Sequence, residues 1–129
     1  LGHWEGVLEE SIDLPYGFIY KITNLTNDKK YIGKKQCQSI RKRPPLKGRK
    51  NKRHEKIETD WKTYTSSSNQ LNEHIRILGK GNFSFEILRW CDSKWELSYH
   101  ETRLQFKEEV LLRDDYYNGI INVRIGRRK

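Results

Sequence analysis

The feature that most constrains the fold is a pair of strand-like runs around a polar turn, within residues 17–33. In the first run, Phe18, Tyr20 and Ile22 alternate with residues of the opposite face, which is the two-residue period of a β-strand. A second β-favouring run begins at Tyr31, and the seven residues between the runs are rich in turn formers. The pattern predicts an antiparallel β-hairpin.

The register of this hairpin decides where its two tyrosines lie. If Asn27 and Asp28 form a two-residue turn, Tyr31 lies opposite Asn24. Asn24 is four residues after Tyr20 on the first strand, so the two side chains point to the same face. Both phenols then project from one face of the hairpin. A three-residue turn without a bulge would place them on opposite faces. From the pattern alone, two aromatic strand residues more often cover a core than form a site.

The length and charge limit the organisation and the partner. With 129 residues, the chain is expected to form one domain over residues 17–129, preceded by an N-terminal arm or short element at residues 1–16. The formal net charge of +9 favours a polyanionic partner. No apolar run is long enough to span a membrane, so no membrane association is expected.

The cysteines and the first residues bear on the compartment. Cys37 and Cys91 are too few for a disulfide framework, and no cysteine and histidine spacing is typical of a zinc site. The first residues lack the basic and apolar regions of a signal peptide. We therefore expect reduced thiols and a cytoplasmic protein.

Positive charge is densest in residues 34–56, which hold eleven of the 26 lysines and arginines and a single acid, Glu55. Pro44, Pro45 and Gly48 predict an extended or irregular loop there rather than a helix. Such a loop suits a phosphate backbone, and the alternative is a solvated charge run. The candidate nucleic-acid-binding residues are Lys34, Lys35, Arg43, Lys47, Arg49, Lys50, Lys52 and Arg53.

A helix is predicted after this basic segment. Ser68 or Asn69 can cap it, and Leu71, Ile75 and Leu78 follow at spacings that place them on one buried face. A glycine-containing turn ends the helix, and the alternation in residues 83–90 predicts a third strand.

A second helix is predicted from a capping box at Ser93 and Glu96 to about Arg113. Its inner stripe includes Leu97, Leu104 and Leu111, and both Glu101 and Glu108 fall on this stripe. A buried carboxylate needs a cation, a hydrogen-bond donor or a metal ion, because its desolvation is costly. The pattern does not choose between the two glutamates, and a carboxylate paired with lysine or arginine at the core edge is an equal alternative.

The chain resembles a known family in several of these features. Ile19-Tyr20, followed after about ten residues by Tyr31-Ile32-Gly33, resembles the paired motif of the GIY-YIG nucleases. The helix, glycine turn and third strand occur in the same order, so the resemblance covers residues 17–34 and 66–118. It implies an α+β fold, a three-stranded antiparallel sheet flanked by helices, that hydrolyses DNA phosphodiesters with one divalent metal ion. Mg²⁺ is the expected ion and Mn²⁺ the alternative.

The resemblance also implies roles for individual residues. Tyr20 would be the general base or would orient the attacking water, and Tyr31 would position that water or a phosphate oxygen. Glu101 would hold the metal ion, with Glu108 as the fallback. A phenol of pKa about 10 is a poor base unless a nearby cation or metal-bound water lowers that pKa.

Two further positions follow from the resemblance. The family carries an asparagine beyond its glutamate helix that fixes the local structure, and Asn118 is its counterpart, with Asn122 as the alternative. The family's glycine directly precedes Ile-Tyr, whereas Phe18 separates Gly17 from that pair here, a departure that does not affect Tyr20.

The family also has a catalytic arginine, and this sequence offers several candidates for it. It lies on a helix shortly after the second motif, and Arg41 stands at a suitable distance from Tyr31. Pro44-Pro45 prevents such a helix from extending, so Arg43, Lys34 and Lys35 compete for the role.

The sequence therefore predicts a metal-dependent DNA endonuclease of phage or mobile-element (homing-like) type, with RNA as an alternative substrate. The basic carboxyl-terminal residues could extend its phosphate-binding surface. Cleavage of both strands would require a homodimer or sequential nicking. The alternative is a non-catalytic nucleic-acid-binding module on the same fold.

Overall fold

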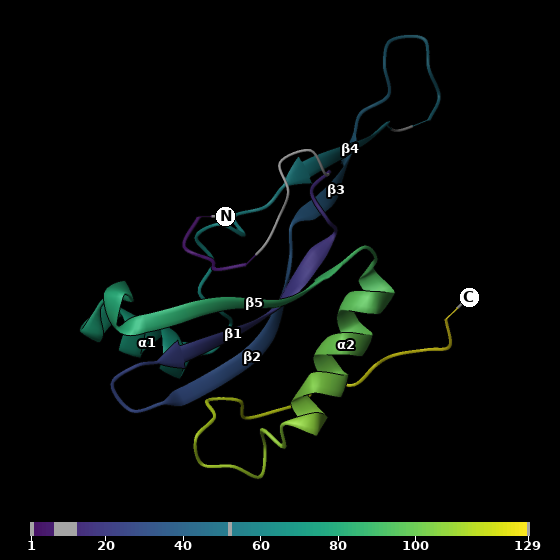
Figure 1. Ribbon diagram of the computed structural model, residues 1–129. Coiled ribbons are helices and arrows are strands. Elements are labelled where there is room, and N and C mark those ends of the chain that lie inside the picture. The colour runs from purple at the N-terminus through teal and green to yellow at the C-terminus, as the bar shows by residue number, and fades with distance from the viewer. Residues whose placement is uncertain (1, 7–12, 52, 129) are drawn as a thin grey trace.

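The protein is built around a three-stranded antiparallel sheet with the strand order β2-β1-β5 (Figure 1). The computed structural model describes residues 2–6, 13–51 and 53–128, and for residues 41–43 and 53 only the backbone. The sheet is formed by β1 (Gly17–Asn24), β2 (Lys29–Gln36) and β5 (Phe83–Cys91). With α1 (Asn69–Leu78) and α2 (Lys94–Lys107), it confirms the predicted α+β architecture.

The hairpin of β1 and β2 has a longer turn than the sequence predicted. Asn24 pairs with Lys29, so four residues form the turn and Tyr31 lies opposite Ile22 rather than Asn24. The Asn24 Oδ1 atom accepts hydrogen bonds from Thr26 N at 3.0 Å and Thr26 Oγ1 at 2.6 Å, which stabilises this wider turn. Side chains alternate between the two faces of a strand, so a turn longer by two residues leaves each side chain on the predicted face. Tyr20 and Tyr31 therefore share a face of the sheet.

Apolar clusters cover both faces of the sheet. On the face of Tyr20, Phe18 and Ile22 pack with Leu71 and Ile75 of α1. On the opposite face, Ile19 and Ile32 pack with Cys91 and with Leu97 of α2. The two helices therefore cover opposite faces, and β2 forms one edge of the sheet.

The amino-terminal residues contribute to the first of these clusters. Trp4 is buried there beside Phe18 and Tyr20, with ring centroids 5.0 Å from each. Its neighbour Glu5 forms a bridge to β5, since Glu5 N donates to Phe85 O at 2.7 Å. Residues 2–6 thus extend the structure beyond the sheet edge formed by β5.

Both predicted helices are present, with differences at their ends. Ser68 caps α1 through its side chain as predicted, but Leu78 at the last turn is exposed. The second helix ends at Lys107 instead of about Arg113. Glu109 has a φ of 52°, and this left-handed residue turns the chain so that Val110 is buried. Leu111, predicted to lie on the inner stripe, is consequently exposed.

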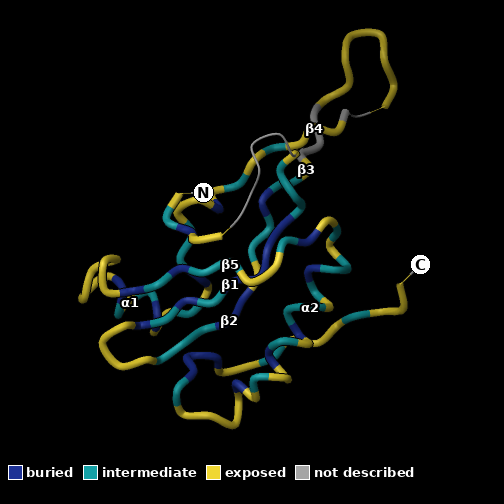
Figure 2. The backbone as a smooth tube through the Cα atoms, in the orientation of Figure 1, coloured by how far each residue is buried: buried dark blue, intermediate teal, exposed yellow. Residues whose placement is uncertain are grey.

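The basic segment is extended toward its ends and irregular at its tip, as the sequence predicted, but its extended parts are paired strands. Its strands β3 (Gln38–Arg43) and β4 (Arg53–Glu58) form a two-stranded antiparallel hairpin, and only the tip lacks regular structure. Figure 1 shows this hairpin projecting away from the three-stranded sheet, and Figure 2 shows an exposed tip. Lys52 lies outside the described residues, and Arg41, Arg43 and Arg53 are described only by their backbone. In the described chain, neither helix is long and apolar enough to cross a bilayer.

Candidate active site

Tyr20 and Tyr31 line one open cavity of about 360 Å³ at the β2 edge of the sheet. Their ring centroids are 6.1 Å apart. Tyr20 is 1% exposed, whereas Tyr31 is only partly buried. The cavity, which we call the tyrosine cavity, is also lined by Lys34, Tyr64, Ser67, Glu101, Gln105, Ile120 and Asn122.

Gly33 leaves the space that the two phenols occupy. It pairs with Tyr20 across the β1–β2 ladder. A Cβ at this position would lie 2.5 Å from Tyr20 Oη and 2.8 Å from Tyr31 Cε1. The glycine of the Tyr-Ile-Gly motif is thus explained by close packing with both tyrosine side chains.

Tyr64 is a third phenol of the cavity that sequence reasoning missed. Its ring lies edge-on beside that of Tyr20, with ring centroids 6.2 Å apart. Lys35 lies over the Tyr64 ring at 4.2 Å and forms an ion pair with Asp60 at 2.8 Å. The segment before α1 has no periodicity from which the direction of a side chain could be predicted. The sequence signal for Tyr64 is therefore only that it is aromatic and stands in a polar segment.

Glu101 reaches the tyrosine cavity from α2. Its side chain is 15% exposed, and its Oε1 lies 3.9 Å from Lys34 Nζ. Burial raises the pKa of this carboxyl, while Lys34 acts in the opposite direction. Glu108, the other glutamate of the stripe, pairs with Arg113 at 3.7 Å and lines a different cavity. Only the first of these two glutamates therefore faces the tyrosines.

The two candidate asparagines have different surroundings. Asn118 is buried and binds the outer edge of β2, with its Oδ1 accepting from Ile32 N at 3.1 Å and its Nδ2 donating to Ile32 O at 2.8 Å. Gln105 Nε2 donates to the same carbonyl at 3.0 Å. Asn122 is exposed and lines the tyrosine cavity. Asn118 thus supports the strand between Tyr31 and Gly33 without lining the cavity.

The phenols of the cavity are held in their neutral forms. Burial raises the pKa of Tyr20 well above its ordinary value, and Tyr31 and Tyr64 add to the effect. Burial likewise raises the pKa values of Tyr31 and Tyr64. In this environment, ionisation of one of the three hydroxyls needs an added cation.

Among the described residues, Lys34 is the basic side chain that lines the tyrosine cavity. It also donates a hydrogen bond to Ser98 Oγ at 3.1 Å. Lys35 contacts the cavity through Tyr64. Arg41, expected in the arginine role, lies in β3 with its backbone opposite Glu55, and its side chain is outside the described part. Of the two competing residues whose side chains are described, Lys34 and Lys35, Lys34 is the one that pairs with Glu101.

The donor set of the cavity is compatible with Mg²⁺. The described residues contain no cluster of three or more histidine, cysteine or acidic side chains that could enclose a metal ion. Mg²⁺ commonly keeps several waters and binds through one or two carboxylates together with substrate phosphates. A single partly buried carboxylate, Glu101, beside an open cavity fits that mode of binding.

Comparison with known proteins assigns the chain to a family. A family model described as "Putative endonuclease segE, GIY-YIG domain" matches residues 3–121. The match includes the basic hairpin and the amino-terminal residues from position 3, which the motifs alone did not cover. No curated protein and no solved structure matches the chain. The family match spans most of the chain and contains every lining residue of the tyrosine cavity except Asn122, and the protein therefore belongs to the GIY-YIG endonuclease family.

Proposed function

We propose that the protein is a divalent-metal-dependent endonuclease that hydrolyses DNA phosphodiester bonds in the tyrosine cavity. The observation that carries the proposal is the position of Glu101, which faces Tyr20 and Tyr31 in one open cavity although it comes from a different element of the fold. Membership of an endonuclease family supports nuclease activity in general and implies a DNA substrate. The metal requirement and the residue roles are the proposed part.

Each residue of the tyrosine cavity can take a separate role in phosphodiester hydrolysis. Glu101 would bind Mg²⁺, or Mn²⁺ in its place, and the bound ion would polarise the scissile phosphate and stabilise the leaving oxygen. Tyr20, beside Tyr64, would orient the attacking water or accept its proton. Tyr31 would position that water or a phosphate oxygen. Lys34, 3.9 Å from Glu101, would balance charge that develops on the phosphate.

The β3–β4 hairpin is proposed as the main phosphate-binding surface. Lys47, Arg49 and Lys50 are exposed at its tip, where long cationic side chains can reach a DNA backbone. If five or six of the basic residues between 34 and 56 contact phosphates, log K should change with log salt with a slope of roughly −5. A slope near zero would contradict the proposal.

The biological setting and assembly are extensions of this proposal. By analogy with homing enzymes, we propose a nuclease of a phage or mobile element. One tyrosine cavity per chain would cut both strands through a homodimer or by sequential nicking. RNA is the alternative substrate, because a phosphate backbone is recognised similarly in both polymers.

A non-catalytic DNA-binding module is the competing function. The raised pKa of Tyr20 favours it, because a phenol that keeps its proton is a poor base. Incubation of supercoiled plasmid with the protein, in Mg²⁺ and in EDTA, separates the two functions. Nicking in Mg²⁺ that EDTA abolishes supports the nuclease. Binding without cleavage in Mg²⁺ and in Mn²⁺ would leave the binding module as the function.

A further inference from the structure

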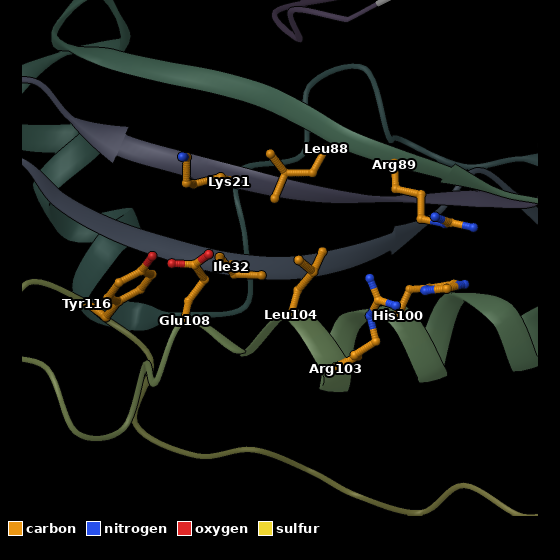
Figure 3. Close-up of a pocket in the computed structure, with 9 residues that line it drawn as sticks. All are labelled: Lys21, Ile32, Leu88, Arg89, His100, Arg103, Leu104, Glu108 and Tyr116. Carbon is orange, nitrogen blue, oxygen red and sulfur yellow. The ribbon is translucent and has the colours of Figure 1, made fainter. Parts of the chain in front are cut away.

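A second cavity lies on the opposite face of the sheet and carries strong positive charge. It has a volume of about 310 Å³ and lies between the sheet and α2 (Figure 3). Lys21, Arg89, His100 and Arg103 supply its basic groups, and Ile32, Leu88 and Leu104 its apolar surface. We call this cavity the basic hollow. None of its lining residues lines the tyrosine cavity.

An irregularity in β5 turns Arg89 toward this hollow. Tyr20 pairs with Ile87, but the preceding residue Ile19 pairs with Arg89, so Leu88 is an extra residue without a partner in the β1–β5 ladder. Regular pairing would place Arg89 on the face of Ile87 and Tyr20. The bulge instead places it on the face of Ile19, and Figure 3 shows its side chain extending toward the part of α2 that carries His100 and Arg103.

The helix places its own residues on two flanks. Leu97 and Leu104 lie toward the sheet, and Glu101 lines the tyrosine cavity on one flank. His100 and Arg103 line the basic hollow on the other flank. The same helix therefore carries the candidate metal ligand and one of the arginines of the hollow.

The two arginines have charge available for a ligand. In the described chain, no carboxylate forms an ion pair with Arg89 or Arg103. Glu108, the acid of the hollow, is paired with Arg113 at 3.7 Å, and Lys21 is paired with Glu86 at 3.8 Å. Two unpaired guanidinium groups facing one cavity match the planar, multidentate recognition of phosphate oxygens.

We propose that the basic hollow is a second phosphate-binding site, in which Arg89 and Arg103 hold the DNA backbone away from the scissile phosphate. The exposed Leu88 and the partly buried Leu104 would contact the adjoining sugar. This inference rests on the proposed DNA substrate but not on catalysis. It predicts that DNA contacts both flanks of α2, one at the tyrosine cavity and one at the hollow.

The test measures DNA binding in EDTA by fluorescence anisotropy over a series of salt concentrations, so that no cleavage is needed. The variant is Arg89→Gln/Arg103→Gln, and the matched control Arg76→Gln/Lys80→Gln removes two exposed cations from the end of α1. The first variant should bind DNA about tenfold or more weakly, because charge-assisted hydrogen bonds are lost. Its salt slope should become shallower by about 1 to 2 units. The control should bind like the parent protein.

A further variant, Arg89→Lys/Arg103→Lys, retains the charge and should recover much of the affinity. The inference is overturned if Arg89→Gln/Arg103→Gln binds with the affinity and slope of the control, or if the parent does not bind DNA. If the parent binds through the two arginines but cuts no DNA in Mg²⁺ or Mn²⁺, the nuclease proposal fails while the second phosphate site stands. Circular dichroism melting checks that each variant is folded.

Discussion

Asn118 binds both backbone polar groups of Ile32, accepting from its N–H at 3.1 Å and donating to its carbonyl at 2.8 Å. Ile32 lies on the edge strand between Tyr31 and Gly33, so this side chain takes the place of a neighbouring strand. It satisfies two edge groups and holds the strand segment on which the tyrosine cavity depends.

Replacing Asn118 should therefore destabilise the protein. Asn118→Ala leaves the Ile32 N–H without its partner, and we expect a loss of about 1–3 kcal/mol in the free energy of unfolding. Urea denaturation measures this loss. Asn122→Ala is the control, because Asn122 is exposed, and it should leave the unfolding free energy nearly unchanged. Equal midpoints for the two variants would contradict the structural role of Asn118.

Gly33→Ala should displace the phenols of the tyrosine cavity. The new methyl group would lie 2.5 Å from Tyr20 Oη, and relief of this clash should cost about 1–3 kcal/mol of stability. The cleavage rate should fall as the tyrosines move. Gly81→Ala is the control, since nothing lies within 4 Å of a Cβ there. If Gly33→Ala cleaves DNA and melts like the parent, the close packing is not important.

Tyr64→Phe should slow DNA cleavage without preventing folding. The change removes the hydroxyl of the ring beside Tyr20 in the cavity but keeps the ring that Lys35 covers. If this hydroxyl helps to orient the attacking water, its hydrogen bond is worth about 1 kcal/mol, and a fall of about fivefold to tenfold in the single-turnover rate is expected. Tyr99→Phe, an exposed tyrosine on α2, is the control. A Tyr64→Phe rate equal to that of the control would remove Tyr64 from the site.

Cys37 should be protected from thiol reagents in the folded protein. It is fully buried, and burial raises its pKa to about 12, above the ordinary value of 9.0. Below pH 9 the thiol is protonated in both states. As the pH rises from 9 toward 12, the unfolded thiol loses its proton first, so this residue's contribution to stability declines. Iodoacetamide labelling of Cys91→Ser at pH 8 should be slow in buffer and fast in urea, and rapid labelling in buffer would contradict this burial.

The sequence predicted the parts of the fold that have strong local signals. Alternation marked β1 and β5, a β-favouring run at Tyr31 marked β2, and the Ser68 and Ser93 caps marked the starts of both helices. The shared face of Tyr20 and Tyr31 was predicted with a two-residue turn, whereas the turn has four residues. The prediction still holds because a shift of two residues leaves each side chain on the same face of its strand.

Features that depend on tertiary contacts were not predictable in the same way. The helix pattern continued beyond Lys107, but the left-handed Glu109 and the burial of Val110 end α2 earlier. Tyr64 lies in a segment without periodicity, and only the folded chain brings it to Tyr20. The choice between Glu101 and Glu108 likewise required the folded structure, because both glutamates fit the same leucine stripe. Only the structure shows that they line different cavities on either side of α2.

The central claim is that Glu101 and Tyr20 act together in phosphodiester hydrolysis, and single-turnover cleavage of supercoiled plasmid in Mg²⁺ tests it most directly. Glu101→Gln and Tyr20→Phe keep nearly the same side-chain shapes, and each is also assayed for DNA binding in EDTA. The account predicts that the parent nicks the plasmid while both variants bind DNA and do not cut it. Cleavage by Glu101→Gln at the parent rate, or a parent that binds DNA and cuts none, would contradict it.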